Sequence, residues 1–168
     1  MSCGWPEFSE DYPEKGNSDI ERWVESYKRA ASHPFFHQGA VERLKRDYDN
    51  HGKLVVGFDF DNTIFDTHNK GGNYSDIISL LQKCKKLGFT LCLYTAELRE
   101  EWLKWKVDYC KHFGIKPDYV NESPLLPGTK KPFFNILLDD RAGLEDAYQT
   151  LKQVVDYANS KSSQSRGE

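Results

Sequence analysis

The feature that most restricts the fold of this chain is an apolar run, residues 54–58, that ends abruptly at Asp59 and Asp61. A continuous apolar run of this length is typical of a strand in a parallel sheet that is covered on both faces. Such a strand delivers the two acids to its carboxyl end, where open α/β sheets bind their ligands. Two carboxylates about 4 Å apart repel each other by roughly 4 kcal/mol at an effective dielectric of about 20. A cation or a shared proton would relieve this repulsion; the alternative is a turn in which both acids contact solvent.

The composition limits the class of protein. The chain has 168 residues, which is long enough for one domain with a single core. Its net charge is −3. The charge gives no general support for nucleic-acid binding, although a local basic groove is compatible with it. No apolar run approaches the ~20 residues that span a bilayer, and residues 1–7 lack the pattern of a signal peptide. The cysteines have no CxxC or zinc-like spacing, so we expect reduced thiols in a cytoplasmic protein with no membrane partner.

Apolar segments alternate with amphipathic helical patterns along the chain. We expect strands at residues 54–58, 89–94, 118–120 and 135–138, and helices at residues 18–31, 39–48, 77–87, 98–113 and 144–158. Strands that alternate with helices form right-handed βαβ crossovers, so the pattern predicts an α/β fold with a parallel sheet. We expect three parts: an amino-terminal irregular segment with two helices packed on the core (1–52), the core itself (53–158) and a disordered tail (159–168).

Polar side chains also follow the later strands. Thr95 ends the second strand, Asp139 and Asp140 follow the last one, and Lys130 and Lys131 lie shortly before it. Because the carboxyl ends of parallel strands meet at one edge of a sheet, these residues are expected to gather there. Taken singly, a threonine at a strand end and two solvated lysines would also be ordinary structural features.

The order of these motifs resembles the haloacid dehalogenase-like phosphatase superfamily, over roughly residues 53–158. Residues 59–63 (DFDNT) match the family's DxDx(T/V) motif, Thr95 matches the second motif, Lys131 the third and the pair at 139–140 the fourth. The resemblance implies a single Rossmann-like three-layer domain with a parallel sheet of strand order 4-1-2-3. The connections between the motifs are too short for a cap domain, so we expect a capless molecule with an open cleft.

The resemblance implies a Mg²⁺-dependent phosphomonoester hydrolase. Asp59 would be the nucleophile that forms a phosphoaspartate, and Asp61 would act as general acid and then as general base. Magnesium would be held by Asp59, by the backbone carbonyl of Asp61 and by one or both of Asp139 and Asp140. Water and the substrate phosphate would complete an all-oxygen shell, which suits this cation.

The resemblance also implies which residues bind the phosphate. Thr95 would donate a hydrogen bond to a phosphate oxygen, and Asn62 could donate another. Lys131 would offset the negative charge of the phosphate, with Lys130 as its competitor. Lys131 is preferred because Pro132, which follows it, fixes the backbone before the last strand.

Two charged residues and the substrate class each have more than one interpretation. Glu97 either points away from the phosphate as an early helix residue or binds a cationic part of the substrate. Arg141 either binds substrate or forms a surface ion pair. The substrate class is unassigned among nucleotides, nucleic-acid ends, sugar phosphates and phosphoproteins. A nucleic-acid end has no support from the net charge.

Two other functions are also compatible with these residues. One is a phosphotransferase of the same fold, which passes the phosphoryl group to an alcohol. The other is a non-catalytic, receiver-like phospho-acceptor module. In receivers the acid pair comes first in the chain and the lysine last, and no general acid follows the acceptor by two residues. Here the DxDxT motif comes first and the acid pair last, which favours a phosphatase.

Overall fold

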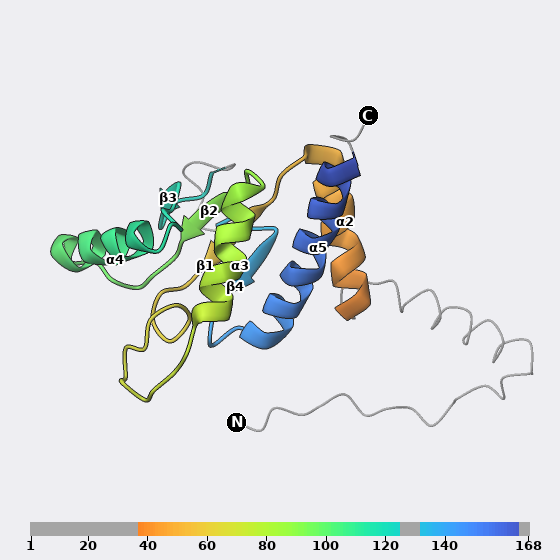
Figure 1. Ribbon diagram of the computed structural model, residues 1–168. Coiled ribbons are helices and arrows are strands. Elements are labelled where there is room, and N and C mark those ends of the chain that lie inside the picture. Colours follow the sequence, from red (N-terminus) through yellow and green to blue (C-terminus); the bar gives the residue numbers. More distant parts are fainter. Residues whose placement is uncertain (1–36, 125–131, 165–168) are drawn as a thin grey trace, which may run out of the picture.

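The computed structural model describes residues 37–124 and 132–164 as an α/β domain (Figure 1). The sheet contains β1 (Val55–Phe58), β2 (Thr90–Leu93), β3 (Tyr119–Val120) and β4 (Ile136–Leu138). The helices are α2 (His37–His51), α3 (Ser75–Lys86), α4 (Glu100–His112) and α5 (Leu144–Gln164). Every expected strand and helix within the described ranges is therefore present. The helix expected at residues 18–31 lies outside the described residues, as do Lys130 and Lys131.

The four strands are parallel and lie in the order β3-β2-β1-β4, which counted from the other edge is β4-β1-β2-β3. This architecture is consistent with a Rossmann-like fold. Phe58, the last residue of β1, pairs with Leu93 of β2 and with Leu138 of β4. Three neighbouring strands therefore end at the same level. The residues that follow them begin at one common edge of the sheet.

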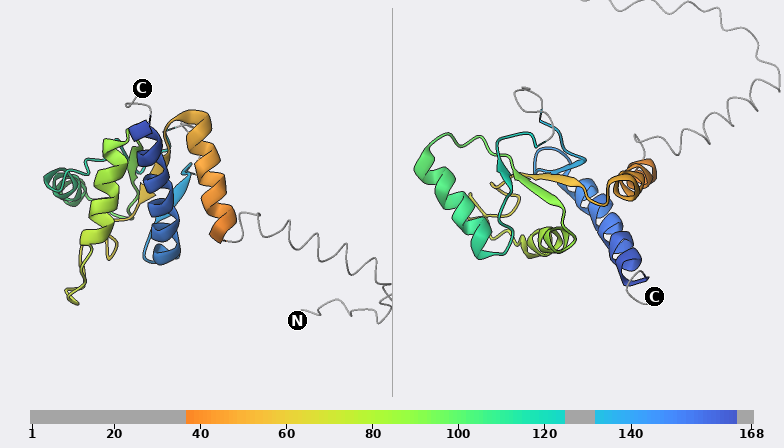
Figure 2. Two further views of the ribbon diagram at one scale, coloured as in Figure 1. Left: turned by 45° about the vertical axis from the view of Figure 1, so that its right-hand side comes forward. Right: turned by 90° about the horizontal axis from the view of Figure 1, so that it is seen from above.

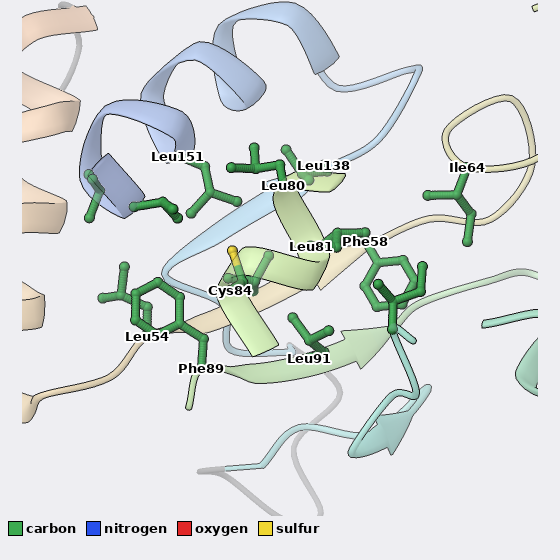
Figure 3. Packing of buried hydrophobic residues seen from close by; sticks show 14 of the residues in the cluster. Leu54, Phe58, Ile64, Leu80, Leu81, Cys84, Phe89, Leu91, Leu138 and Leu151 are labelled. Atoms are coloured by element: carbon green, nitrogen blue, oxygen red, sulfur yellow. The ribbon is translucent and has the colours of Figure 1, made fainter. Parts of the chain in front are cut away.

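Helices α3 and α5 pack on one face of the sheet and against each other, and α2 packs against α5. Figures 1 and 2 show α4 set apart from this layer, on the side of β2 and β3. The core between the sheet and the α3–α5 layer contains fully buried apolar side chains, among them those of Phe58, Leu81, Leu91, Leu138 and Leu151 (Figure 3). Burying a side chain of this kind contributes about 1.5–3 kcal/mol. This core fixes the strands and hence the edge at which they end.

The opposite face of the sheet is covered closely at Gly57. A Cβ atom at this position would lie 2.7 Å from the ring of Phe134, a contact too short for real atoms. The Phe134 ring also meets the ring of Tyr94, with centroids 5.6 Å apart. Glycine in the middle of β1 is therefore required by the approach of Phe134.

The last helix extends past the boundary expected from the sequence. The pattern predicts an end at Ala158, followed by a disordered tail, whereas α5 continues to Gln164. Contacts with α2 account for the extra turns: Tyr157 Oη donates to Asp49 Oδ2 at 2.9 Å, and Lys161 Nζ donates to Asp49 Oδ1 at 2.6 Å. Residues 159–164 are thus helical because the neighbouring helix offers a charged partner.

The described cysteines, Cys84, Cys92 and Cys110, are buried free thiols. Burial raises the pKa of Cys84 to about 12 and that of Cys92 to about 11, so both are unreactive at neutral pH. None of the described helices combines the length and the apolar character needed to cross a membrane.

Candidate functional site

A cleft of about 1060 Å³ lies at the carboxyl edge of the sheet. It is lined by the loops that follow β1, β2 and β4, and by residues of α4. The described candidate residues all lie on it: Asp59, Asp61, Asn62, Thr95, Asp139 and Asp140. The structure therefore brings together side chains that are up to 81 positions apart in the sequence (140 − 59 = 81). The remaining two candidates, Lys130 and Lys131, lie outside the described residues.

The loop after β1 is a tight turn that aims Asp61 into the cleft. The backbone N–H groups of Ile64 and Phe65 both donate to the carbonyl oxygen of Phe60, each at 3.1 Å. Asn62 has a φ of 55°, in the left-handed region that asparagine tolerates better than most residues. Its N–H donates to the carbonyl oxygen of Phe65 at 2.7 Å, which closes the turn.

Thr63 connects this turn to the loop that follows β4. Its side chain is completely buried, and its hydroxyl oxygen accepts a hydrogen bond from the backbone N–H of Asp140 at 3.1 Å. Asp59 makes a second connection, because its N–H donates to the carbonyl oxygen of Leu138 at 2.9 Å. These two hydrogen bonds therefore hold the acids at the ends of β1 and β4 in fixed relative positions.

A buried lysine, Lys106 of α4, lies at the centre of the site. Its ammonium nitrogen is 2.5 Å from Oδ2 of Asp61 and 3.0 Å from the hydroxyl oxygen of Thr95. It also lies 4.9 Å from the centroid of the Phe60 ring, within range of a cation–π contact. Only 7% of the Lys106 side chain is exposed. A charge this deeply buried needs a counter-ion and hydrogen-bond acceptors. Asp61 is the counter-ion of Lys106, and Thr95 is a further acceptor.

Sequence reasoning missed Lys106. It placed the positive charge of the site at Lys131 or Lys130, because a lysine before the last strand completes the resemblance. A signal was nevertheless present: Leu103, Lys106, Val107 and Cys110 share the i, i+3, i+4, i+7 spacing of a buried helix face. A lysine within an apolar stripe is unusual, and such a residue needs a buried acidic partner.

The contacts of Asp61 determine its protonation state. Partial burial by itself raises the pKa of Asp61, but hydrogen bonds from Lys106 and Thr67 oppose this effect, and the net pKa is lowered. The Thr67 hydroxyl donates to Asp61 Oδ1 at 2.6 Å, so both carboxylate oxygens accept a hydrogen bond. In this ligand-free arrangement Asp61 is therefore ionised at neutral pH.

Asp59 has the opposite character. Burial raises its pKa to about 6, a hydrogen bond from the Phe60 backbone opposes this rise, and repulsion by Asp139, Asp61 and Asp140 adds to it. Burial and, to a smaller extent, the neighbouring acids therefore oppose the ionised form of Asp59. A cation beside Asp59 would lower its pKa again and keep it ionised.

The donor atoms of the site suit magnesium in kind. The acids around Asp59 offer only oxygen ligands, and their mutual repulsion would be relieved by a divalent cation. In residues 37–124 and 132–164, however, no group of three or more His, Cys, Asp or Glu side chains is already arranged to hold a metal ion. A magnesium ion at this site would therefore have to keep several water or phosphate ligands, because the described side chains do not enclose one by themselves.

Glu97 is neutralised by its neighbour Arg99. The Glu97 carboxylate accepts hydrogen bonds from the guanidinium of Arg99 at 2.9 and 2.8 Å, and from the backbone N–H groups of Leu98 and Arg99. The Arg99 side chain is the main cause that lowers the pKa of Glu97 to about 2. Glu97 thus stabilises the turn that leads into α4, and Arg99 offsets its negative charge at the wall of the cleft.

Arg141 and His68 bring further polar groups to the cleft. The backbone N–H of Arg141 donates to Asp139 Oδ1 at 2.8 Å. Among the described residues, no ion pair is found for the Arg141 guanidinium. Nδ1 of His68 lies 3.0 Å from Oδ1 of Asn62, so the loop after the DFDNT segment contacts the segment itself. Arg141 and His68 therefore line the cleft together with the acids, whereas the contacts of Lys106 described above are with Asp61, Thr95 and Phe60.

Comparisons with known proteins add little to this geometry. No protein-family model matches the chain, and no curated protein matches it. Among solved structures, a conserved protein from Bacteroides thetaiotaomicron is similar, with a TM-score of 0.49 and 20% sequence identity. The similarity covers 60% of this chain and 91% of that protein. It assigns neither a family nor an activity, so the class defined so far is an α/β domain with an acidic, lysine-bearing cleft.

Proposed function

We propose that this chain is a Mg²⁺-dependent phosphomonoester hydrolase of the capless haloacid dehalogenase-like type. The observation that carries the proposal is the cluster of Asp61, Lys106 and Thr95 beside Asp59, at the edge where β1 and β2 end. Phosphoryl transfer needs an in-line nucleophile, a proton donor for the leaving oxygen and positive charge for the equatorial oxygens. The cleft offers a residue for each task.

The residues act in two steps. A carboxylate oxygen of Asp59 attacks phosphorus, the bond to the ester oxygen breaks, and Asp61 gives that oxygen its proton. A water molecule then attacks the phosphoaspartate, Asp61 takes a proton from it, and the bond between phosphorus and Asp59 breaks. Inorganic phosphate leaves, and both carboxylates return to their starting states.

The phosphate itself prepares Asp61 for its role as an acid. A phosphate bound at Thr95 and Lys106 competes with Asp61 for the lysine and brings negative charge close to it. Both effects raise the pKa of Asp61 from the low value that Lys106 and Thr67 impose without ligand. Substrate binding therefore favours the protonated form that the leaving oxygen needs.

Thr95 and Lys106 hold the transferring group. A hydrogen bond fixes the backbone at Thr95: its N–H donates to Asn121 Oδ1 at 2.8 Å. Its hydroxyl can donate to a phosphate oxygen while it accepts a hydrogen bond from Lys106. The Lys106 ammonium offsets charge on the same oxygens. Lys131 is retained as a second cation of the proposed site.

Magnesium, held by Asp59, the Asp61 carbonyl and one or both of Asp139 and Asp140, would neutralise charge on the phosphate. The support for it is the raised pKa of Asp59, whose main cause is burial and which the neighbouring acids raise further. Without a cation, the negative charge of these acids opposes the approach of a phosphate dianion. Chelation of magnesium is therefore expected to abolish turnover.

Hydrolysis of a generic aryl phosphate tests the proposal. The wild type is assayed with Mg²⁺, with EDTA, and with Mg²⁺ restored, beside Asp59→Asn. Asp108→Asn is the matched control, because Asp108 is an exposed acid of α4 that pairs with Lys111 at 2.7 Å. Activity that needs Mg²⁺ and Asp59 but tolerates the control substitution supports the proposal. Hydrolysis by Asp59→Asn at the wild-type rate would exclude Asp59 as the nucleophile.

The same assay separates the two alternatives. A phosphotransferase forms a new phosphate ester when an alcohol is added, at the expense of inorganic phosphate. A receiver-like module takes one phosphoryl group per chain and shows no turnover. Catalytic release of inorganic phosphate that is unaffected by added alcohol favours the hydrolase.

A further inference from the structure

Exposed aromatic side chains line the cleft beside the proposed phosphate position. Trp102 is 48% exposed, Trp105 is 41% exposed and Tyr94 is 38% exposed, and all three lie on the cleft wall. Large apolar side chains that remain exposed together in a concave site mark a place where a ligand binds. The cleft therefore has a polar part, around Lys106 and the acids, and an aromatic part.

The two tryptophans differ in how they are held. Trp105 packs into a cluster of rings, with its centroid 5.5 Å from Phe60, 5.2 Å from Phe65 and 5.9 Å from Tyr109. Trp102 lies at the margin of this cluster, with its centroid 6.0 Å from that of Trp105. The guanidinium carbon of Arg99 lies 5.3 Å from the centroid of the Trp102 ring. Trp105 is thus part of the wall, and Trp102 is a supported ring with nearly half of its surface available.

The position of Trp102 relative to Lys106 sets the size of the ligand. The two residues are four positions apart in α4, so their side chains share one face of the helix and their Cα atoms are separated by about 6 Å along its axis. A ligand whose phosphate meets Lys106 would reach Trp102 with a group about one sugar unit away.

We infer that the substrate of this site is a nucleoside phosphate, whose base stacks on Trp102 while its phosphate lies between Lys106 and Asp59. This inference rests on the proposed function and specifies its substrate class. Every nucleobase has a flat π-face, so stacking on a tryptophan accepts such bases without reading their sequence. Arg99 stabilises the Trp102 ring from one side, and its pairing with Glu97 removes negative charge from this part of the cleft. The phosphate-bearing nucleoside can be a free mononucleotide or the end of an oligonucleotide, since both present the same chemistry.

The first test compares substrates in the full-length protein with Mg²⁺. Values of kcat/KM are measured for adenosine 5′-monophosphate, a short 5′-phosphorylated and a short 3′-phosphorylated oligonucleotide, phosphotyrosine and glycerol phosphate. The inference predicts that a nucleotide substrate exceeds both phosphotyrosine and glycerol phosphate. The two kinds of nucleotide substrate show whether a free nucleotide or a strand end is preferred. A higher kcat/KM for phosphotyrosine or glycerol phosphate than for every nucleotide substrate would overturn the inference.

The second test uses Trp102→Ala, with Trp102→Phe as the conservative variant and Tyr119→Ala as the control. Tyr119 is 37% exposed and does not line the cleft. The ratio of kcat/KM for the nucleotide over glycerol phosphate should fall roughly 5- to 150-fold in Trp102→Ala. It should be largely restored in Trp102→Phe and retained in Tyr119→Ala. An unchanged ratio in Trp102→Ala would overturn the inference.

A binding experiment separates this inference from the proposed reaction. Adenosine 5′-monophosphate is titrated by calorimetry, with Mg²⁺ present, into Asp59→Asn with and without Trp102→Ala. Weaker binding in the double variant supports the base-stacking site even if no phosphate ester is hydrolysed, in which case only the reaction is wrong. Equal binding in both variants, with aryl phosphate hydrolysis intact in the wild type, leaves the reaction standing and overturns the nucleoside assignment.

Discussion

The ammonium nitrogen of Lys106 lies 2.5 Å from Oδ2 of Asp61, so a buried helix residue meets an acid that lies 45 positions earlier in the chain. This pair joins α4 to the loop after β1. It also lowers the pKa of Asp61 and, through the second contact of Lys106, holds the Thr95 hydroxyl in place. One side chain therefore influences the proposed acid and the proposed phosphate ligand together.

Removal of the Lys106 charge should reduce activity far more than stability. Lys106→Met keeps a long apolar stem, and Asp61 is exposed enough to be hydrated when its partner is lost. We expect the free energy of unfolding to change by no more than about 1–2 kcal/mol, and kcat to fall by roughly 10²–10³. Lys104→Met, at an exposed position of the same helix, is the control and should have little effect on either quantity. An unchanged kcat in Lys106→Met would contradict the assigned role.

Asp59 should make the protein less stable as the pH rises through mildly acidic values in EDTA. Its folded pKa of about 6 lies above the unfolded value, so the folded state binds more protons in this range. The stability that the protonated form contributes is complete below about pH 4 and is lost progressively as the pH rises through about 6. The loss should be on the order of 1–2 kcal/mol in urea unfolding. Asp59→Asn should remove this part of the pH dependence, and an unchanged slope in that variant would contradict the raised pKa.

The hydrogen bond between Thr63 and the backbone of Asp140 can be removed without a change in shape. Thr63→Val replaces the hydroxyl by a methyl group, which leaves the N–H of Asp140 without its acceptor at this site. We expect a loss of about 1–3 kcal/mol in the free energy of unfolding, measured by chemical denaturation. Thr63→Ser keeps the hydroxyl and should lose less. An unchanged free energy of unfolding in Thr63→Val would show that the hydroxyl makes no stabilising contact.

Gly57 should not accept a side chain while Phe134 covers it. Gly57→Ala places a Cβ atom 2.7 Å from the Phe134 ring, and overpacking of this kind costs about 1–3 kcal/mol. The measurement is Tm, compared among Gly57→Ala, Phe134→Leu and the double variant. The double variant should be more stable than the sum of the two single losses predicts. Strictly additive losses would mean that the two positions do not contact each other.

The sequence predicts the framework of the site well, for physical reasons. Buried strands leave continuous apolar runs, so the acids at 59, 61, 139 and 140 could be assigned to strand ends. Parallel strands end at one edge, so those acids could be expected to gather there. The pairing of Phe58 with Leu93 and Leu138 brings the three strand ends level, as this expectation requires.

The parts that could not be predicted depend on contacts between distant segments. Lys106 belongs to the site because α4 turns one face toward the loop after β1, and helical periodicity alone does not say which acid a buried lysine will meet. The extension of α5 to Gln164 depends on Asp49 of another helix. The role of Glu97 depends on Arg99, whose side chain folds back on it. In each case the function of a polar side chain depends on which other side chain the fold places beside it.

The most direct test of the central claim is the identification of the phosphorylated residue. Asp61→Asn is mixed with Mg²⁺ and an aryl phosphate, whose leaving group needs little help from an acid, and the reaction is quenched rapidly. Intact mass spectrometry and peptide mapping are then used to locate the added phosphoryl group. The account predicts one phosphoryl group on Asp59, absent in Asp59→Asn/Asp61→Asn. A phosphoryl group on another residue, or wild-type hydrolysis with no phosphorylated chain in the trapped variant, would contradict it.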